Sequence, residues 1–175
     1  LPVSCQGSYI PDSIDGIYKG KRELALHTKH GFGTSAYLGD IRSRGTRISI
    51  GGKAEGILPV LKGLIADSQY VSQGNTRRGS VAAYLPFDHA DFDEIIDFVT
   101  ATPEDANIGF NFSDYNIGKL EAQDPEAIRR FKRLMKLKMV TGRGYLSFID
   151  KMNRLAPEAI KNSGIPIVAS NLCVS

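Results

Sequence analysis

The sequence predicts an α/β protein built around a largely parallel sheet or barrel, and three observations lead to this expectation. Short apolar runs of strand length alternate with longer segments of helical periodicity along the chain. Residues that favour helix caps, such as Asp, Ser and Gly, stand at many of the boundaries. The 175 residues, 42% hydrophobic and 23% charged, suffice for one packed domain. We therefore expect residues 1–175 to form a single domain.

The first half of the chain contains signals for both element types. In chain order we expect a strand at 1–10, a helix at 11–31, a strand at 32–38, a helix at 54–71, a loop at 72–80 and a strand at 81–87. Asp12 or Ser13 can cap the first helix, and Gly31 stands where a left-handed cap would end it. Pro59 either lies near the start of the second helix or bends it.

The second half continues the alternation. We expect a helix at 88–100, a strand at 107–113, a helix at 124–140, and strands at 143–150 and 164–174. Asp88 is the expected cap of the first of these helices, and Asp124 with Pro125 marks the start of the second. In parallel sheets chemistry gathers at the carboxyl ends of the strands. Cys5 and Cys173 are expected near such ends, so both thiols could face one pocket.

Charge and cysteine content exclude several classes of protein. A net charge of +3 is too mild to indicate nucleic acid or an acidic membrane, and no apolar run approaches the ~20 residues that span a bilayer. Two cysteines make no secreted disulfide framework, which favours a reducing, cytoplasmic setting. The histidines are not spaced from either cysteine as zinc ligands, so no metal site is expected. Two buried thiols that behave as small apolar residues remain an alternative.

Two loops carry arginines among small polar residues. They are "GDIRSRGTR" at 39–47 and "SQGNTRRGS" at 72–80. Guanidinium groups and exposed amides suit phosphate or a nucleotide base, although a solvated turn would look the same. The pair of loops favours an anionic nucleotide as the ligand.

The order of the motifs is more specific than any one of them. "SC" is followed by "DSI", "GFG", "GDIRSRGTRI", "SQGNTRRGS", the pattern Y-L-P-x-x-H-x-D-x-x-x-x-I, "TGRGYLSFID" and finally "SNLC". In this order they resemble the catalytic subunit of ribonucleotide reductase, through nearly the whole chain. The resemblance implies roughly the first half of a ten-stranded α/β barrel. It also implies reduction of ribonucleotides to deoxyribonucleotides by thiyl-radical chemistry.

The resemblance also assigns catalytic and substrate-binding residues. By resemblance, Cys173 of "NLC" lies on a finger loop inside the barrel and carries the thiyl radical, and Cys5 belongs to the redox pair that supplies electrons. Asn171 matches the asparagine that hydrogen-bonds the ribose hydroxyls. Ser4 and Gly31 match residues that line the substrate site.

The resemblance also assigns a second group of residues to allosteric control. Asp12, Ser13 and Ile14 match the segment that holds a nucleoside triphosphate effector, and Arg42 and Ile48 lie on the first effector loop. Residues 71–80 match the second loop, which relays the identity of the effector to the substrate base. Within that loop, Gln73 and Arg77 are the candidates for contact with the base.

The resemblance implies partners that this chain does not carry. The substrate would be a ribonucleoside di- or triphosphate, and the parent protein is expected to be a homodimer. The radical would come from a partner subunit with a metal centre or from adenosylcobalamin, so no cofactor is expected here. The family pattern Asn-Leu-Cys-x-Glu has Ser175 at its last position, and the chain starts at Leu1. We therefore expect an internal fragment, inactive alone. A non-enzymatic nucleotide-binding module is the alternative.

Overall fold

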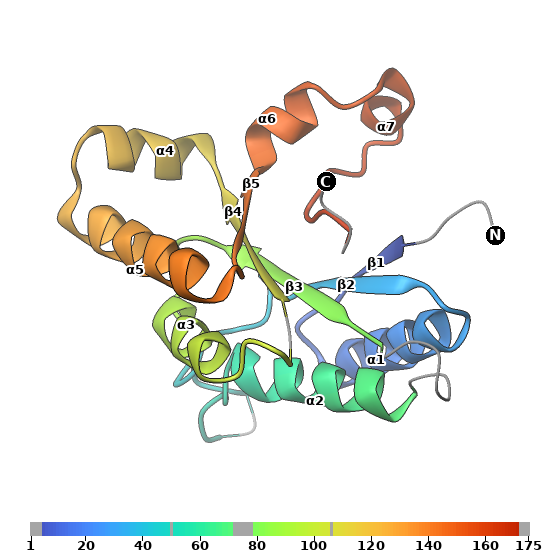
Figure 1. Cartoon of the computed structure of the whole chain (residues 1–175). Coiled ribbons are helices and arrows are strands. Elements are labelled where there is room, and N and C mark those ends of the chain that lie inside the picture. Colours follow the sequence, from blue (N-terminus) through green and yellow to red (C-terminus); the bar gives the residue numbers. More distant parts are fainter. Residues whose placement is uncertain (1–4, 50, 72–78, 106, 172–175) are drawn as a thin grey trace.

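One parallel sheet organises the chain. The computed structural model describes residues 5–49, 51–71, 79–105 and 107–171. Its five strands follow the chain in the order β1-β2-β3-β4-β5, and every neighbouring pair is parallel (Figure 1). The strands are β1 (Cys5–Tyr9), β2 (Gly33–Tyr37), β3 (Val81–Pro86), β4 (Asn107–Phe112) and β5 (Tyr145–Phe148). The predicted α/β class with a parallel sheet is confirmed.

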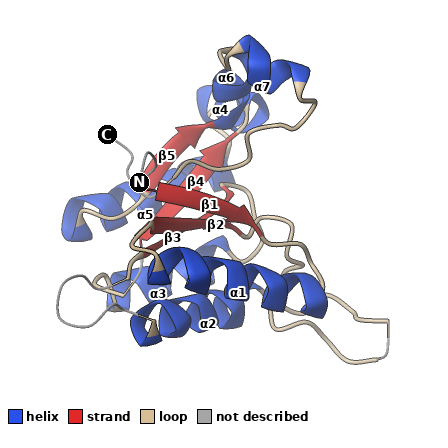
Figure 2. Ribbon diagram, turned by 90° about the vertical axis from the view of Figure 1, so that its right-hand side faces the viewer, coloured by secondary structure: helices blue, strands red, loops and turns tan. Residues whose placement is uncertain are grey.

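Seven helices accompany the strands in the described part of the chain, and four of them cover one face of the sheet. The seven helices are α1 (Ile14–Lys29), α2 (Ile57–Tyr70), α3 (Phe92–Ala101), α4 (Asp114–Glu121), α5 (Pro125–Thr141), α6 (Ile149–Arg154) and α7 (Glu158–Asn162). The main core lies between the sheet and α1, α2, α3 and α5, and it includes Leu61, Phe92 and Leu134 (Figures 1 and 2). Burial of these apolar side chains is the dominant favourable term in the folding of this layer.

Several of the predicted helix boundaries are confirmed. The Ser13 hydroxyl accepts a hydrogen bond from the amide of Gly16 at 3.0 Å and caps α1. After α1 the chain reverses at Gly31, whose φ of 84° is the left-handed conformation that glycine adopts without strain. Asp124 caps α5 by accepting from the amide of Ala127, with Pro125 at the first helical position.

Three expectations differ from the structure. Helix α3 begins at Phe92 rather than at Asp88, and Asp91 occupies the position before it. Residues 164–171, expected in a strand, form no strand in their described part, and α6 and α7 precede them. Helix α4 was not expected, because its eight residues are mostly polar. Its N-cap is Ser113, which forms a capping box with Asn116.

Alternation along each strand gives the sheet two unlike faces. Val81, Ala83 and Leu85 of β3 point into the helix-covered core, whereas Ala82 and Tyr84 point the other way. We call that second face the polar face. Strand register places on it Cys5, Gly7 and Tyr9 of β1, Gly33, Ser35 and Tyr37 of β2, Ala82 and Tyr84 of β3, Asn107, Gly109 and Asn111 of β4, and Tyr145 and Ser147 of β5.

Candidate functional site

The segment after α7 is held against the polar face by side chains of three different strands. The Ser35 hydroxyl donates to the carbonyl oxygen of Ser170 at 2.9 Å, and the Tyr84 hydroxyl donates to that of Asn171 at 3.0 Å. The Asn111 amide donates to the carbonyl oxygen of Val168 at 2.6 Å. These donors stand on the face of the sheet rather than at its edge. The segment therefore crosses the sheet without joining it as a strand, which explains the failed strand expectation.

A cavity of about 340 Å³ lies between this segment and strands β1 and β2. Its lining residues are Gly7, Ser8, Tyr9, Tyr37, Val168, Ala169, Ser170 and Asn171. Gly7 is small for a reason, because a Cβ atom there would lie 2.8 Å from the Ser35 hydroxyl that holds the segment. Asn171, one of the predicted site residues, lines this cavity on the polar face of the sheet.

A row of tyrosines crosses the polar face, and the sequence reasoning did not identify it. Tyr9, Tyr37 and Tyr84 are successive partners in register, then Gly109, then Tyr145. Tyr9 stacks on Tyr37 with ring centroids 6.1 Å apart, and Tyr84 stacks on Tyr145 at 6.5 Å. The tyrosine in four of the expected strands was the available signal. Only the register shows that the four rings form one row.

Burial sets the protonation state of two of these rings. It raises the pKa of Tyr37 and of Tyr84 to about 12, because a phenolate would lose its hydration there. Both hydroxyl groups are therefore neutral near pH 7, and the Tyr84 hydroxyl donates to the carbonyl oxygen of Asn171. At the outer end of the row the Tyr9 hydroxyl donates to the Asp40 carboxylate at 2.6 Å, and this bond also raises the pKa of Tyr9.

Asn111 leaves one polar atom unused. Its Oδ1 is buried and has no hydrogen-bond partner among the described residues, while its Nδ2 holds the carbonyl oxygen of Val168. Buried polar atoms are nearly always paired, so an orphan acceptor on this face marks a place where a further donor fits. Nothing in the sequence distinguished this asparagine from its neighbours.

Cys5 lies on the polar face but at the opposite edge from the one expected. It is the first residue of β1, pairs in register with Gly33 at the start of β2, and is 9% exposed. The expectation that it lies near the carboxyl end of a strand is therefore wrong. Gly31 lies at this same amino edge, two residues before β2, and its amide donates to the carbonyl oxygen of Thr28 at 2.9 Å.

The expected effector residues lie at the carboxyl edge. Asp12 follows β1 and Arg42 follows β2, and the Arg42 guanidinium contacts the Asp12 carboxylate at 2.7 Å. The structure thus brings together two residues that are thirty positions apart. The Ser13 hydroxyl is committed to capping α1, and Ile14 is 74% exposed. Ile48 lies in the hairpin of residues 45–54, where its carbonyl oxygen accepts from Gly51 at 3.1 Å.

The two predicted groups of residues therefore form two sites. Cys5 and Gly31 lie at the amino edge and Asp12 and Arg42 at the carboxyl edge, separated by the length of a five-residue strand, about 16 Å. Ser4, Gln73, Arg77 and Cys173 lie outside the described residues. Among the arginines of the first loop, Arg44 forms ion pairs with Glu55 at 2.5 Å and with Glu94 at 2.8 Å.

Metal-binding clusters and membrane-spanning helices are both missing from the described residues. In that part of the chain no group of three or more His, Cys, Asp or Glu side chains is placed to hold a metal ion. The described helices include none that is long and apolar enough to cross a membrane.

Comparison with known proteins identifies the family. Residues 3–120 match the family model "Ribonucleotide reductase, barrel domain". A Frog virus 3 (isolate Goorha) protein named as a ribonucleoside-diphosphate reductase large subunit is 31% identical over 194 residues, covering 99% of this chain and 33% of that protein. The ribonucleoside-diphosphate reductase large subunit of Invertebrate iridescent virus 6 is 29% identical over 203 residues, covering 100% of this chain and 20% of that protein.

A solved structure agrees with the sequence matches. The Actinobacillus ureae class Id ribonucleotide reductase alpha subunit superposes with a TM-score of 0.86 at 34% identity, covering 99% of this chain and 32% of that one. The chain thus spans about a third or less of the length of these three proteins. Its parallel sheet, with the main helical layer on one face, corresponds to part of a barrel. The chain belongs to the ribonucleotide reductase barrel-domain family.

Proposed function

We propose that this chain forms part of the active-site barrel of a ribonucleotide reductase large subunit, which we call the complete subunit. The observation that carries the proposal is the position of Asn171, which Ser35 and Tyr84 hold against the polar face one residue after Ser170. Family membership favours this reading over a nucleotide-binding module without thiol chemistry. The substrate class is a ribonucleoside di- or triphosphate.

In the proposed reaction the thiyl radical of Cys173 removes the 3′ hydrogen of the ribose. The 2′ hydroxyl then leaves as water after protonation, and two thiols supply two electrons and close to a disulfide. Cys5 is one of these thiols, and the second comes from outside this chain. Asn171 binds the ribose hydroxyls. Reduction of the sugar is thus balanced by oxidation of two thiols, and the 3′ hydrogen returns to carbon from Cys173.

The polar face suits radical chemistry because it can be shielded from water. Radical intermediates are lost to side reactions unless the site is closed, and residues 168–171 are hydrogen-bonded across β2, β3 and β4 on this face. Neutral tyrosines and serines on this face donate hydrogen bonds without adding charge. The radical itself originates outside the chain, at the metal centre of a partner subunit or from adenosylcobalamin.

Allosteric control is the second part of the proposal. A nucleoside triphosphate effector would bind at the carboxyl edge, at the amino end of α1 and on the loop of residues 39–56. Asp12 and Arg42 are in contact there, and Ile14 is exposed. The complete subunit is proposed to work as a cytoplasmic homodimer, with a radical-generating subunit where its radical source is a metal centre.

The effector site is tested by Asp12→Asn in the complete subunit, with Asp15→Asn as the control. Both remove one negative charge at the amino end of α1, but Asp12 contacts Arg42 whereas Asp15 lies within the first turn of the helix. We expect Asp12→Asn to change which base is reduced under a given effector, by about 5- to 150-fold in relative turnover. Asp15→Asn should leave these ratios unchanged. Equal relative turnover of the bases in both variants and the parent would show that the effector does not bind at this edge.

A further inference from the structure

Asp91 is a buried carboxylate that neither caps α3 nor takes part in the proposed reaction. It is 5% exposed and occupies the position before α3, yet it makes no side-chain capping bond to that helix. Its two oxygens point away, toward the loop of residues 39–56. Oδ1 accepts from the amide of Arg44 and Oδ2 accepts from the amide of Ile57, both at 2.9 Å.

These two amides lie on either side of the hairpin of residues 45–54. Arg44 precedes the hairpin of residues 45–54, and Ile57 is the first residue of α2. One carboxylate therefore closes the base of the hairpin while it satisfies a free amide at a helix start, where negative charge is favoured. The fit is tight, since a Cβ atom on Gly56 would lie 2.4 Å from Asp91 Oδ2.

His89 extends the same clamp toward Arg42. Its Nδ1 accepts from the amide of Asp91 at 3.1 Å, and its Nε2 lies 3.0 Å from the carbonyl oxygen of Ile41. A neutral imidazole with its proton on Nε2 satisfies both contacts. The guanidinium of Arg130, on α5, donates to the carbonyl oxygen of His89 at 2.8 Å.

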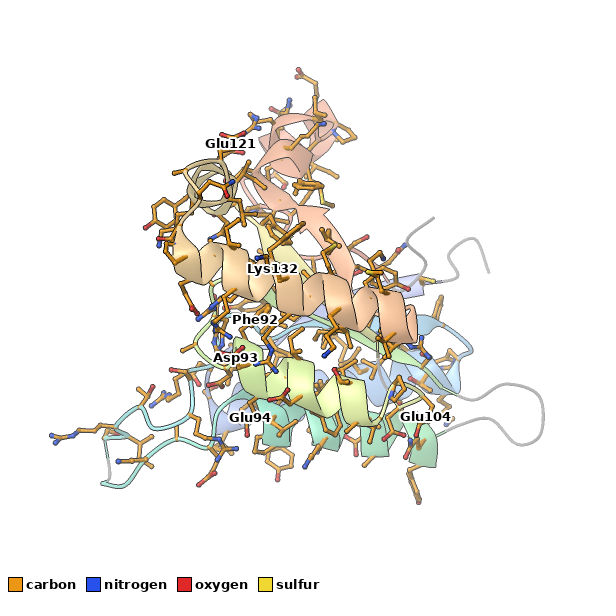
Figure 3. The ribbon with its side chains drawn as sticks, turned by 60° about the vertical axis from the view of Figure 1, so that its left-hand side comes forward. Phe92, Asp93, Glu94, Glu104, Glu121 and Lys132 are labelled. Atoms are coloured by element: carbon orange, nitrogen blue, oxygen red, sulfur yellow. The ribbon has the colours of Figure 1, made fainter. Side chains whose placement is uncertain are left out.

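Asp91 and His89 thus hold the loop at Arg44 and Ile41. Ion pairs from Arg44 to Glu55 within the loop and to Glu94 of α3 add to the clamp. Figure 3 shows the loop projecting beside the end of α3 where Asp93 and Glu94 are labelled. Beyond the clamp, the hairpin is joined by the amide of Gly45 to the carbonyl oxygen of Ala54 at 2.9 Å.

We propose that Asp91 and His89 are positioning residues that fix the 39–56 loop, and with it Arg42, for binding of the nucleotide effector. This inference rests on the proposed effector site at the carboxyl edge. The two residues touch neither the cavity on the polar face nor Asp12. Their loss should therefore weaken the response to the effector while the chemistry on the polar face continues.

The first experiment compares Asp91→Asn with Asp97→Asn in the complete subunit. An asparagine keeps one acceptor and loses the second, whereas Asp97 is exposed and pairs with Arg133 of α5 instead of the loop. We expect Asp91→Asn to raise the half-saturating effector concentration by about tenfold or more, the scale of one hydrogen bond to a buried charged group. The KM for substrate at saturating effector should change less than about twofold. Amide exchange at Arg44 and Ile57 should accelerate.

His89 gives an independent variant if Asp91→Asn fails to fold. His89→Ala removes both contacts of the ring, whereas His89→Gln keeps a donor that reaches toward Ile41. We expect the alanine variant to weaken the effector response and the glutamine variant to restore most of it. An unchanged half-saturating concentration in folded Asp91→Asn, or in His89→Ala, would overturn the clamp. Failure of the parent to bind any nucleoside triphosphate would instead refute the effector site on which the clamp rests.

Discussion

At the scale of the residue, the sequence suggested which side chains take part in a site, but not always where in the sheet they lie. The family resemblance implies both Asp12 and Arg42 as effector contacts, and the structure places the two side chains 2.7 Å apart, while the effector role stays a prediction. The prediction for Cys5 names the wrong edge of the sheet, because a short run such as "LPVSCQGSYI" does not show where its pairing with the next strand begins. Tyr84 could not be singled out, since its role depends on register with neighbours far away in sequence.

Tyr84 allows a test of burial on the polar face. Its hydroxyl donates to Asn171, and burial raises its pKa to about 12. In the unfolded chain a tyrosine ionises near pH 10, so stability from the buried neutral ring is complete below pH 10 and is lost as pH rises toward 12. Tyr84→Phe should therefore be less stable than the parent at pH 8. The difference between the two free energies of unfolding should shrink by about 1–3 kcal/mol between pH 10 and pH 12.

Urea unfolding of the complete subunit at several alkaline pH values measures this difference. Tyr70→Phe is the control, because Tyr70 is 91% exposed on α2 and its loss should leave stability unchanged. The difference in the free energy of unfolding between Tyr84→Phe and the parent could instead stay constant from pH 8 to pH 12. That result would show that the ring is not held neutral by burial.

At the scale of the element, capping and periodicity predicted most helices and five of the strands. Ser13 and Asp124 cap as expected, because local side-chain chemistry decides helix starts. The prediction for Asp88 is wrong, since two acidic residues, Asp88 and Asp91, precede α3 and only tertiary contacts show that Asp91 serves the loop and α2. The apolar run at 164–174 resembles a strand, but in its described part side chains of the sheet hold its carbonyl oxygens. Periodicity carries no information about such partners.

A substitution at Gly109 tests the packing of β3 against β4, and a substitution at Gly118 in α4 provides the comparison. Gly109 interrupts the row of tyrosines, and a Cβ atom there would lie 2.2 Å from a ring carbon of the fully buried Tyr84. Gly109→Ala should destabilise by about 1–3 kcal/mol, the usual scale of overpacking. At Gly118, within α4, an added Cβ atom would meet nothing within 4 Å beyond the backbone of its own helix. Gly118→Ala should stabilise by about 0.5–1 kcal/mol.

Differential scanning calorimetry of the two variants in the complete subunit gives the comparison. Opposite shifts in Tm, downward for Gly109→Ala and upward for Gly118→Ala, are expected. A neutral Gly109→Ala would mean that the Tyr84 ring has room to move, and the described face would then be less closely packed than its contacts indicate.

At the scale of the whole molecule, the alternation of strands and helices was enough to predict a parallel sheet, because parallel strands need crossover connections. Which face of the sheet carries the proposed site was not predictable in this way. It required the register, which places small and polar residues of all five strands on one side. The proposed roles of Cys5, Asn171 and Cys173 came from the order of motifs rather than from periodicity or composition. The structure adds that Asn171 is held over that face.

The central claim is that this barrel reduces ribonucleotides through a thiyl radical on Cys173, and Cys173→Ser in the complete subunit tests it most directly. A serine hydroxyl cannot hold the radical, whereas the proposed effector residues Asp12 and Arg42 lie at the carboxyl edge of the sheet. With a reductant and the matching radical source supplied, we expect deoxyribonucleotide formation to fall below detection while effector affinity stays at the parent value. Turnover comparable to that of the parent would contradict the radical role of Cys173 and, with it, the proposed mechanism.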